Sequence, residues 1–177
     1  PAALFMMITK TLLKNAAQSG FSPGEAMESV NNQLLENNEA EMFVTVWLGI
    51  YEISTGKLTA ANAGHEYPAL KRAGGRFELY KDKHGFVMAG MEDVVYREYT
   101  LKLHAGDMLF VYTDGVAEAT DKNDELYGTE RMVAALNRTP DGDARTLCEA
   151  GREDINRFVG DAEQFDDITM LALRIRS

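Results

Sequence analysis

The sequence is poor in the residues that build disulfides, thiolate metal sites and histidine-based catalytic centres. Among its 177 residues there is one cysteine, Cys148, and there are three histidines. A single cysteine cannot form an intrachain disulfide or a thiolate zinc cluster. This usage is typical of a reducing compartment, so we expect a cytoplasmic protein in which Cys148 packs on the apolar face of a helix.

Basic residues and long apolar runs are also scarce. The chain carries 18 basic and 28 acidic side chains, which gives a formal net charge of −10. Proteins that bind nucleic acids need clustered Lys and Arg for the phosphates, and this composition argues against that class. No segment approaches the roughly 18 consecutive apolar residues of a membrane span. We therefore expect neither a nucleic-acid partner nor a membrane span.

The length and the order of the predicted elements indicate a single α+β domain over residues 1–177. Two helices come first, the second capped by Ser22; the first is apolar on most of its surface, which predicts that it is buried. Hairpin-linked strands follow, then two more helices, the last of them after an N-cap at Thr139, and a closing strand. We expect the strands at 42–51, 57–63, 68–72, 76–80, 95–103, 108–113 and 168–175, in an antiparallel β-sandwich flanked by helices.

The excess negative charge lies in two segments. Residues 107–130 contain seven acidic residues and one basic residue, and residues 153–167 contain six acidic residues and one basic residue. The rest of the chain is therefore almost neutral. Solvated surface is the usual explanation for an acidic segment, and the alternative is that two distant segments meet to hold cations.

Each acidic segment contains aspartates next to a predicted strand. Asp114-Gly115 follows the apolar strand that ends near Thr113, and Asp166-Asp167 precedes the closing strand. Alone, each is typical of an ordinary turn or strand cap. Together they suggest an oxygen-ligand site for Mg²⁺ or Mn²⁺, because hard cations prefer carboxylates and water over thiolate and imidazole.

These motifs resemble the protein phosphatase 2C-like (PPM) family, in its SpoIIE/RsbU-type branch. The resemblance covers the whole chain in family order, and its most specific part is the block around Asp114. The matching segments are residues 103–119 with 126–128, Met42-Phe43-Val44-Thr45, Asn62-Ala63-Gly64-His65 and Asp166-Asp167-Ile168-Thr169.

The resemblance implies a metal-dependent Ser/Thr protein phosphatase in which a metal-activated water hydrolyses phosphoserine or phosphothreonine. It implies that Asp114 and Asp166 bind a pair of Mn²⁺ or Mg²⁺ ions, and that no protein side chain acts as the nucleophile. Gly115 and Asp167 are accessory candidates, and Asp167 could equally cap the last strand. His65 is expected to be a turn histidine bonded to backbone, not a catalytic acid.

In the family, an early aspartate and a bridging metal ligand precede a Pro-Ala-Ala-Leu helix start, and this sequence begins at Pro1-Ala2-Ala3-Leu4. The resemblance therefore leads us to expect an N-terminally incomplete phosphatase domain, weakly active alone and joined to a sensor or receiver domain. The expected substrate is a small phosphorylated regulator of an anti-sigma factor. The alternatives are a catalytically inactive binding module and a homodimer formed through the N-terminal helices.

Overall fold

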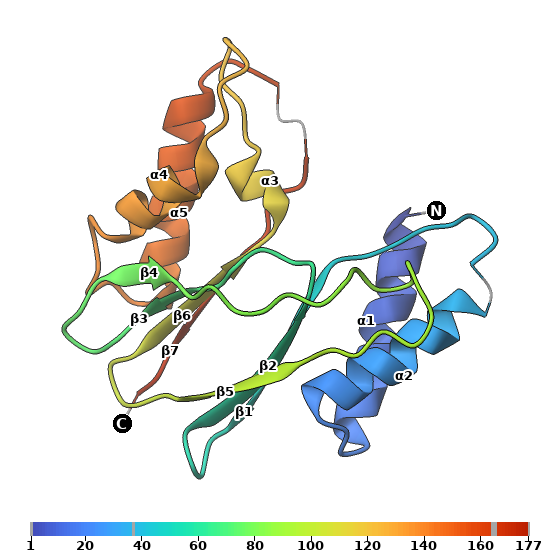
Figure 1. Cartoon of the computed structure of the whole chain (residues 1–177). Helices are drawn as coiled ribbons and strands as arrows, with labels where there is room; N and C mark the ends of the chain where they lie inside the picture. The colour runs from blue at the N-terminus through green and yellow to red at the C-terminus, as the bar shows by residue number, and fades with distance from the viewer. Residues whose placement is uncertain (1, 37, 164–165, 177) are drawn as a thin grey trace. The chain divides into compact units, whose positions relative to one another are not determined.

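The computed structural model describes residues 2–36, 38–163 and 166–176, and its helices and strands follow the predicted order. The chain divides into two compact units that are described separately (Figure 1). The first unit consists of Pro1–His65 and Asp82–Leu103, and the second of Glu66–Lys81 and His104–Ser177. Within the described residues, no helix is long and apolar enough to cross a membrane.

Helices α1 (Ala2–Gln18) and α2 (Pro23–Leu35) open the first unit. Helix α2 begins as predicted, because Ser22 and Glu25 form a reciprocal capping box with Pro23 in the first turn. Its apolar stripe is fully buried, with Met27 and Val30 in the core beside the sheet. The local capping signal and the burial of the apolar residues therefore both favour a helix over these residues.

Helix α1 is less buried than its composition predicts. Its inward stripe follows the i, i+4, i+8 spacing and consists of Phe5, Thr9 and Leu13. On the other side, Leu4 and Met7 are 64% and 60% exposed. The helix is therefore buried along one stripe, and several of the apolar residues for which burial was expected are exposed.

A three-stranded antiparallel sheet completes the first unit. Strands β1 (Val46–Glu52), β2 (Lys57–Ala63) and β5 (Glu98–Lys102) lie in the order β1-β2-β5. The predicted hairpin at residues 54–56 joins β1 to β2, whose register pairs Val46 with Ala63. The strand expected from residue 42 begins at Val46, because Val44 makes only an isolated bridge to Met88.

The irregular segment before β5 is attached to α2 by a buried asparagine. Asn31 is fully buried, and its Oδ1 accepts hydrogen bonds from the Ala89 N–H at 2.8 Å and the Tyr96 hydroxyl at 3.1 Å. Its amide donates to the Met91 carbonyl at 2.9 Å. These bonds satisfy backbone groups that no strand ladder serves, so a segment without regular structure acquires a fixed position on α2.

The second unit contains a four-stranded antiparallel sheet in the order β4-β3-β6-β7. Strand β6 is central and nearly all buried, as its unbroken apolar sequence predicts. The strands are β3 (Ala69–Lys71), β4 (Phe77–Leu79), β6 (Met108–Tyr112) and β7 (Met170–Arg174). The predicted hairpin of β3 and β4 is confirmed, with Ala69 opposite Leu79.

Helices α4 (Gly128–Leu136) and α5 (Ala144–Val159) pack on this sheet, and the short helix α3 (Asp114–Ala117) follows β6. Phe110, Met132, Leu147 and Ile155 meet in their shared core. The predicted start of the last helix is wrong: Asp143, not Thr139, is its N-cap. The Asp143 carboxylate accepts the Thr146 N–H at 2.8 Å, while Thr139 belongs to a preceding turn.

A buried aspartate secures the turn before β6. Asp107 is 2% exposed and receives the Arg72 guanidinium at 2.7 Å, together with the N–H groups of Ala73 and His104. Burial acts to raise the pKa of Asp107, but the hydrogen bonds of His104, Arg72 and Ala73 outweigh it and hold that pKa below its ordinary value. The ionised carboxylate therefore stabilises the fold.

Replacing Asp107 by Asn should lower the free energy of unfolding at pH 7 by about 1–2 kcal/mol, because charge-assisted hydrogen bonds are lost. The loss is no larger because Arg72 is half exposed, and solvent screens its charge. The folded pKa is depressed, so the wild-type advantage is present above the unfolded value of about 3.9 and disappears as pH falls through the folded pKa. Denaturant unfolding at several pH values measures this, with exposed Asp161→Asn as control. Equal stabilities at pH 7 would contradict the prediction.

Candidate metal centre

Asp114 lies where β6 gives way to α3. Thr113 has an extended backbone, with φ −84° and ψ 160°, and Asp114 is the first residue of the helix. The Asp114 side chain is exposed, and its Oδ1 accepts the N–H of Gly115 at 2.9 Å. The sharp change from strand to helix thus places a carboxylate at the end of the sheet, as the Asp-Gly motif predicts.

Asp166 and Asp167 lie just before β7, with the Asp166 Oδ1 accepting the Asp167 N–H at 2.6 Å. Strand β7 runs antiparallel to β6 and pairs Met170 with Tyr112. The residues that follow β6 and those that precede β7 therefore meet at the same end of the sheet. Gln164 and Phe165, which precede Asp166 in the sequence, lie outside the described residues.

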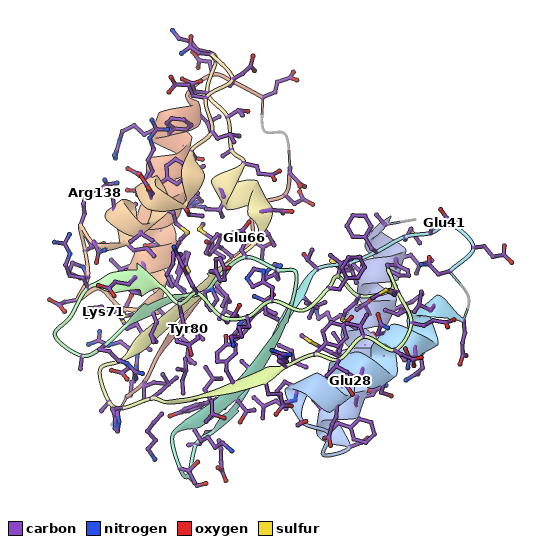
Figure 2. The ribbon with its side chains drawn as sticks, in the orientation of Figure 1. Glu28, Glu41, Glu66, Lys71, Tyr80 and Arg138 are labelled. Carbon is purple, nitrogen blue, oxygen red and sulfur yellow. The ribbon has the colours of Figure 1, made fainter. Side chains whose placement is uncertain are left out.

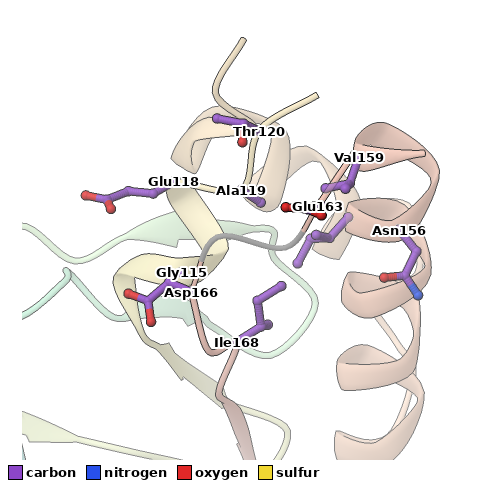
Figure 3. Close-up of a pocket in the computed structure, with 10 residues that line it drawn as sticks. Gly115, Glu118, Ala119, Thr120, Asn156, Val159, Glu163, Asp166 and Ile168 are labelled. Atoms are coloured by element: carbon purple, nitrogen blue, oxygen red, sulfur yellow. The ribbon is translucent and has the colours of Figure 1, made fainter. Parts of the chain in front are cut away.

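The two aspartate segments touch at Gly115. A β-carbon on Gly115 would lie 2.6 Å from the Asp167 carbonyl oxygen and 3.1 Å from its carbonyl carbon. Real β-carbon contacts do not approach backbone so closely, so only glycine fits here without a backbone shift. Figure 3 shows Gly115 on its helix beside Asp166 on the neighbouring segment. Gly115 thus allows the two segments to approach each other closely, and it contributes no side chain to the site.

A small cavity of about 40 Å³ lies next to these segments (Figure 3). The residues around it include the apolar Ile155, Val159 and Ile168 and the acidic Glu118, Glu163 and Asp166, and Figure 3 shows the Glu118 carboxylate pointing away from Val159 and Asn156. This volume holds a few water molecules at most. Glu163 was not predicted as a site residue, because its sequence neighbours give no sign that the chain turns back onto Gly115.

The donor chemistry at this end of the sheet suits a hard divalent cation. Asp114 and Asp166 offer oxygen donors from two loops that the sheet brings together, and Mg²⁺ commonly uses one or two protein carboxylates with several waters. Within the described ranges, no group of three or more His, Cys, Asp or Glu side chains converges on one point. The described residues therefore fit part of a metal site and do not form a complete ligand set by themselves.

A buried tyrosine supports the strand that leads to Asp114. Tyr112 is 3% exposed, and burial, reinforced by the negative charge of Glu66, raises the pKa of its hydroxyl. The phenol is therefore neutral at physiological pH.

Two acids of the negative segments are bonded within the fold, away from the candidate site. Asp154, on α5, accepts a hydrogen bond from the Tyr127 hydroxyl at 2.6 Å and pairs with Arg138 and Arg157. Burial acts to raise its pKa, but Tyr127 and the two guanidinium groups hold the pKa below its ordinary value. Arg138 is labelled in Figure 2. Asp154 and Asp107 thus stabilise the fold. The charge count along the two segments therefore included acids that do not lie at the candidate site.

His65 and Cys148 lie where a structural role would place them. The Asn62 side chain accepts the His65 N–H at 2.7 Å and donates to its carbonyl oxygen, while the ring Nδ1 lies 3.1 Å from the Thr45 hydroxyl. The sequence predicted a turn histidine whose ring bonds backbone; the described ring contact is instead to the Thr45 side chain, and it is the His65 backbone that the Asn62 side chain binds. Cys148 is partly buried on α5, and burial raises the pKa of its thiol, which disfavours a reactive thiolate.

Known proteins are similar to this chain in sequence and in fold. The chain matches the family model described as Stage II sporulation protein E (SpoIIE) over residues 1–176. It is 25% identical to phosphoserine phosphatase RsbU of Bacillus subtilis over 181 aligned residues, which cover 98% of the chain and 51% of RsbU. The chain spans about half or less of the length of the curated relatives that it matches.

Solved structures establish the fold. The SiaA-PP2C domain of Pseudomonas aeruginosa superposes with a TM-score of 0.84 at 18% identity, over 99% of this chain and 70% of that one. The catalytic domain of the serine/threonine phosphatase PstP, solved with two manganese ions, gives a TM-score of 0.69 at 14% identity, over 99% of this chain and 82% of that one. The α+β, phosphatase 2C-like fold predicted from the sequence is confirmed.

Replacing Gly115 by Ala should destabilise the protein by about 1–3 kcal/mol, the usual cost of overpacking, because the new methyl group meets the Asp167 backbone. Gly151→Ala on α5 is the matched control. Its methyl group would meet only the flexible end of Met170 at 3.3 Å, and alanine favours a helix over glycine by up to about 1 kcal/mol. Denaturant unfolding of both variants measures the contrast, and equal effects would refute the close approach.

Proposed function

This chain belongs to the SpoIIE family, and we propose that it forms most of the catalytic domain of a metal-dependent phosphatase acting on phosphoserine or phosphothreonine in a signalling protein. The observation that carries the proposal is the contact of the Asp114 and Asp166 segments at Gly115, beside β6 and β7. The printed activity of RsbU, a phosphoserine phosphatase, supports the reaction class. We further propose that residues 1–177 belong to one such domain.

The proposed role of Asp114 and Asp166 is to bind two Mn²⁺ or Mg²⁺ ions together with ligands from elsewhere. Such a metal pair supplies a water of lowered pKa and neutralises charge on the phosphoryl group. The manganese ions in the PstP structure support this choice of metal. The antiparallel pairing of β6 with β7, which brings the Asp114 and Asp166 segments to the same end of the sheet, supports this assignment.

The proposed substrate is a small phosphorylated regulator of an anti-sigma factor, by analogy with the family. A homodimer through the N-terminal helices stays a prediction: the apolar residues that α1 exposes offer a surface for it, and light scattering of the purified protein measures it. Neither proposal is needed for the assignment of Asp114 and Asp166.

Replacing Asp114 by Asn in the full-length protein should reduce Mn²⁺-dependent phosphate release from a phosphoserine protein by about 100-fold or more. Mutation of a residue that hydrogen-bonds to a metal ligand typically lowers metal affinity or activity about 10- to 100-fold, and mutation of a ligand itself should lower activity at least as much. Phosphate release at saturating substrate, over a series of Mn²⁺ concentrations, gives the measurement.

Asp124→Asn is the matched control for this experiment. It removes the same charge from an exposed position with φ +62°, a conformation that asparagine adopts readily. Undiminished activity of the Asp114 variant would remove Asp114 from the metal site. If the wild-type protein releases no phosphate but still binds the phosphoprotein, the protein is instead a phosphatase-like binding module.

A further inference from the structure

At the end of the β6–β7 ladder, the side chain of Thr113 takes the place of a backbone carbonyl as hydrogen-bond acceptor. Its N–H donates to the Thr169 carbonyl at 3.0 Å, as an antiparallel pair requires. The return bond does not go to the Thr113 carbonyl: the Thr169 N–H donates to the Thr113 hydroxyl oxygen at 3.0 Å. The Thr113 hydroxyl oxygen is therefore the acceptor where a regular antiparallel pair would use the Thr113 carbonyl oxygen.

The reason lies in the start of α3. The Thr113 carbonyl oxygen accepts the Val116 N–H at 3.0 Å, so it has turned away from β7 to begin the helix that carries Asp114. Without a hydroxyl at residue 113, the Thr169 N–H would have no partner on this strand. A side chain with a short acceptor thus lets the chain leave the sheet abruptly and keep the sheet paired to its end.

The same hydroxyl also reaches the segment of the second aspartate pair. It donates its proton to the Asp167 carbonyl oxygen at 3.1 Å. This carbonyl is the group that a β-carbon at Gly115 would strike, so the hydroxyl and the glycine act on one atom from two sides. Thr113 is adjacent to Asp114 in sequence, and Asp167, whose N–H is bonded to the Asp166 carboxylate, is adjacent to Asp166.

We propose that Thr113 is a positioning residue for the metal centre: its hydroxyl fastens the Asp166–Asp167 segment to the strand that ends at Asp114. This assignment rests on the proposed function, because it assumes that Asp114 and Asp166 bind a divalent cation. The hydroxyl touches neither the metal nor the substrate. It restricts the motion of one carboxylate-bearing segment relative to the other. Less conformational entropy is then lost when a metal binds to both.

The test compares Thr113→Val, which keeps the shape and removes the hydroxyl, with Thr113→Ser, which keeps the hydroxyl, in the full-length protein. Calorimetric titration with Mn²⁺ should show an affinity about 10- to 100-fold weaker for the Val variant, the range seen when groups that orient metal ligands are removed, and near wild-type affinity for the Ser variant. In the metal-free protein, hydrogen exchange of the peptide containing Thr169 should be faster for Val than for Ser.

Thr9→Val is the control for loss of a threonine hydroxyl in general. The Thr9 hydroxyl donates to the Phe5 carbonyl at 2.9 Å within α1, so this variant should leave Mn²⁺ affinity unchanged. If Thr113→Val does not fold, Thr113→Ala replaces it in the comparison with Ser.

The outcomes separate the two levels of the proposal. Wild-type Mn²⁺ affinity in a folded Val or Ala variant would overturn the role of Thr113 alone. If the wild-type protein itself binds no Mn²⁺, or if Asp114→Asn binds it equally well, the proposed function fails and the positioning role falls with it. Weaker affinity in Val with recovery in Ser supports both.

Discussion

The pairing of β6 with β7 is the constraint on which the candidate site depends. The two strands are separated by more than fifty residues, and closing so long a loop costs conformational entropy that local contacts cannot offset. The core beneath them offsets it: Phe110, Met132, Leu147 and Ile155 are buried between the sheet and its helices. Burial of side chains of this size contributes about 1.5–3 kcal/mol each. The carboxylates at the rim can therefore stay exposed and polar, because apolar residues elsewhere hold their strands together.

The sequence alone was sufficient to predict the order of the long helices and the strands, and that Asp114 and Asp166 lie beside two of those strands; it did not predict the short helix α3. Capping boxes, hairpin turns and apolar strands are local patterns, and the Asp-Gly and Asp-Asp motifs stand directly beside strands that those patterns identify. The start of α5 was predicted wrongly because Thr139-Pro140 and Asp143 are both plausible local caps. Asp143 is the cap, with its carboxylate on the Thr146 N–H, while Gly142 closes a turn onto Thr139.

The parts that could not be predicted depend on contacts between distant residues. Asp107, Asp154 and Asp166 are the same residue type in equally acidic surroundings. One is bonded to Arg72 in a buried turn, one to Tyr127 and Arg138 between helices, and one lies at the rim beside Gly115. Only the fold decides which groups each carboxylate meets and which carboxylates lie at the rim of the sheet. A count of charges along the chain cannot make that distinction.

The three residues Thr113-Asp114-Gly115 illustrate how a short motif can combine separate physical requirements. The first position needs a compact side chain that both accepts and donates a hydrogen bond, since the Thr169 N–H and the Asp167 carbonyl flank it. The second carries the charge, and the third must have no side chain, because the Asp167 carbonyl is too close. Two of these requirements concern the position of a neighbouring segment, and only the charge of Asp114 concerns the proposed cation. The motif therefore connects two loops, and the carboxylate that we propose as a ligand lies between the two residues that make the connection.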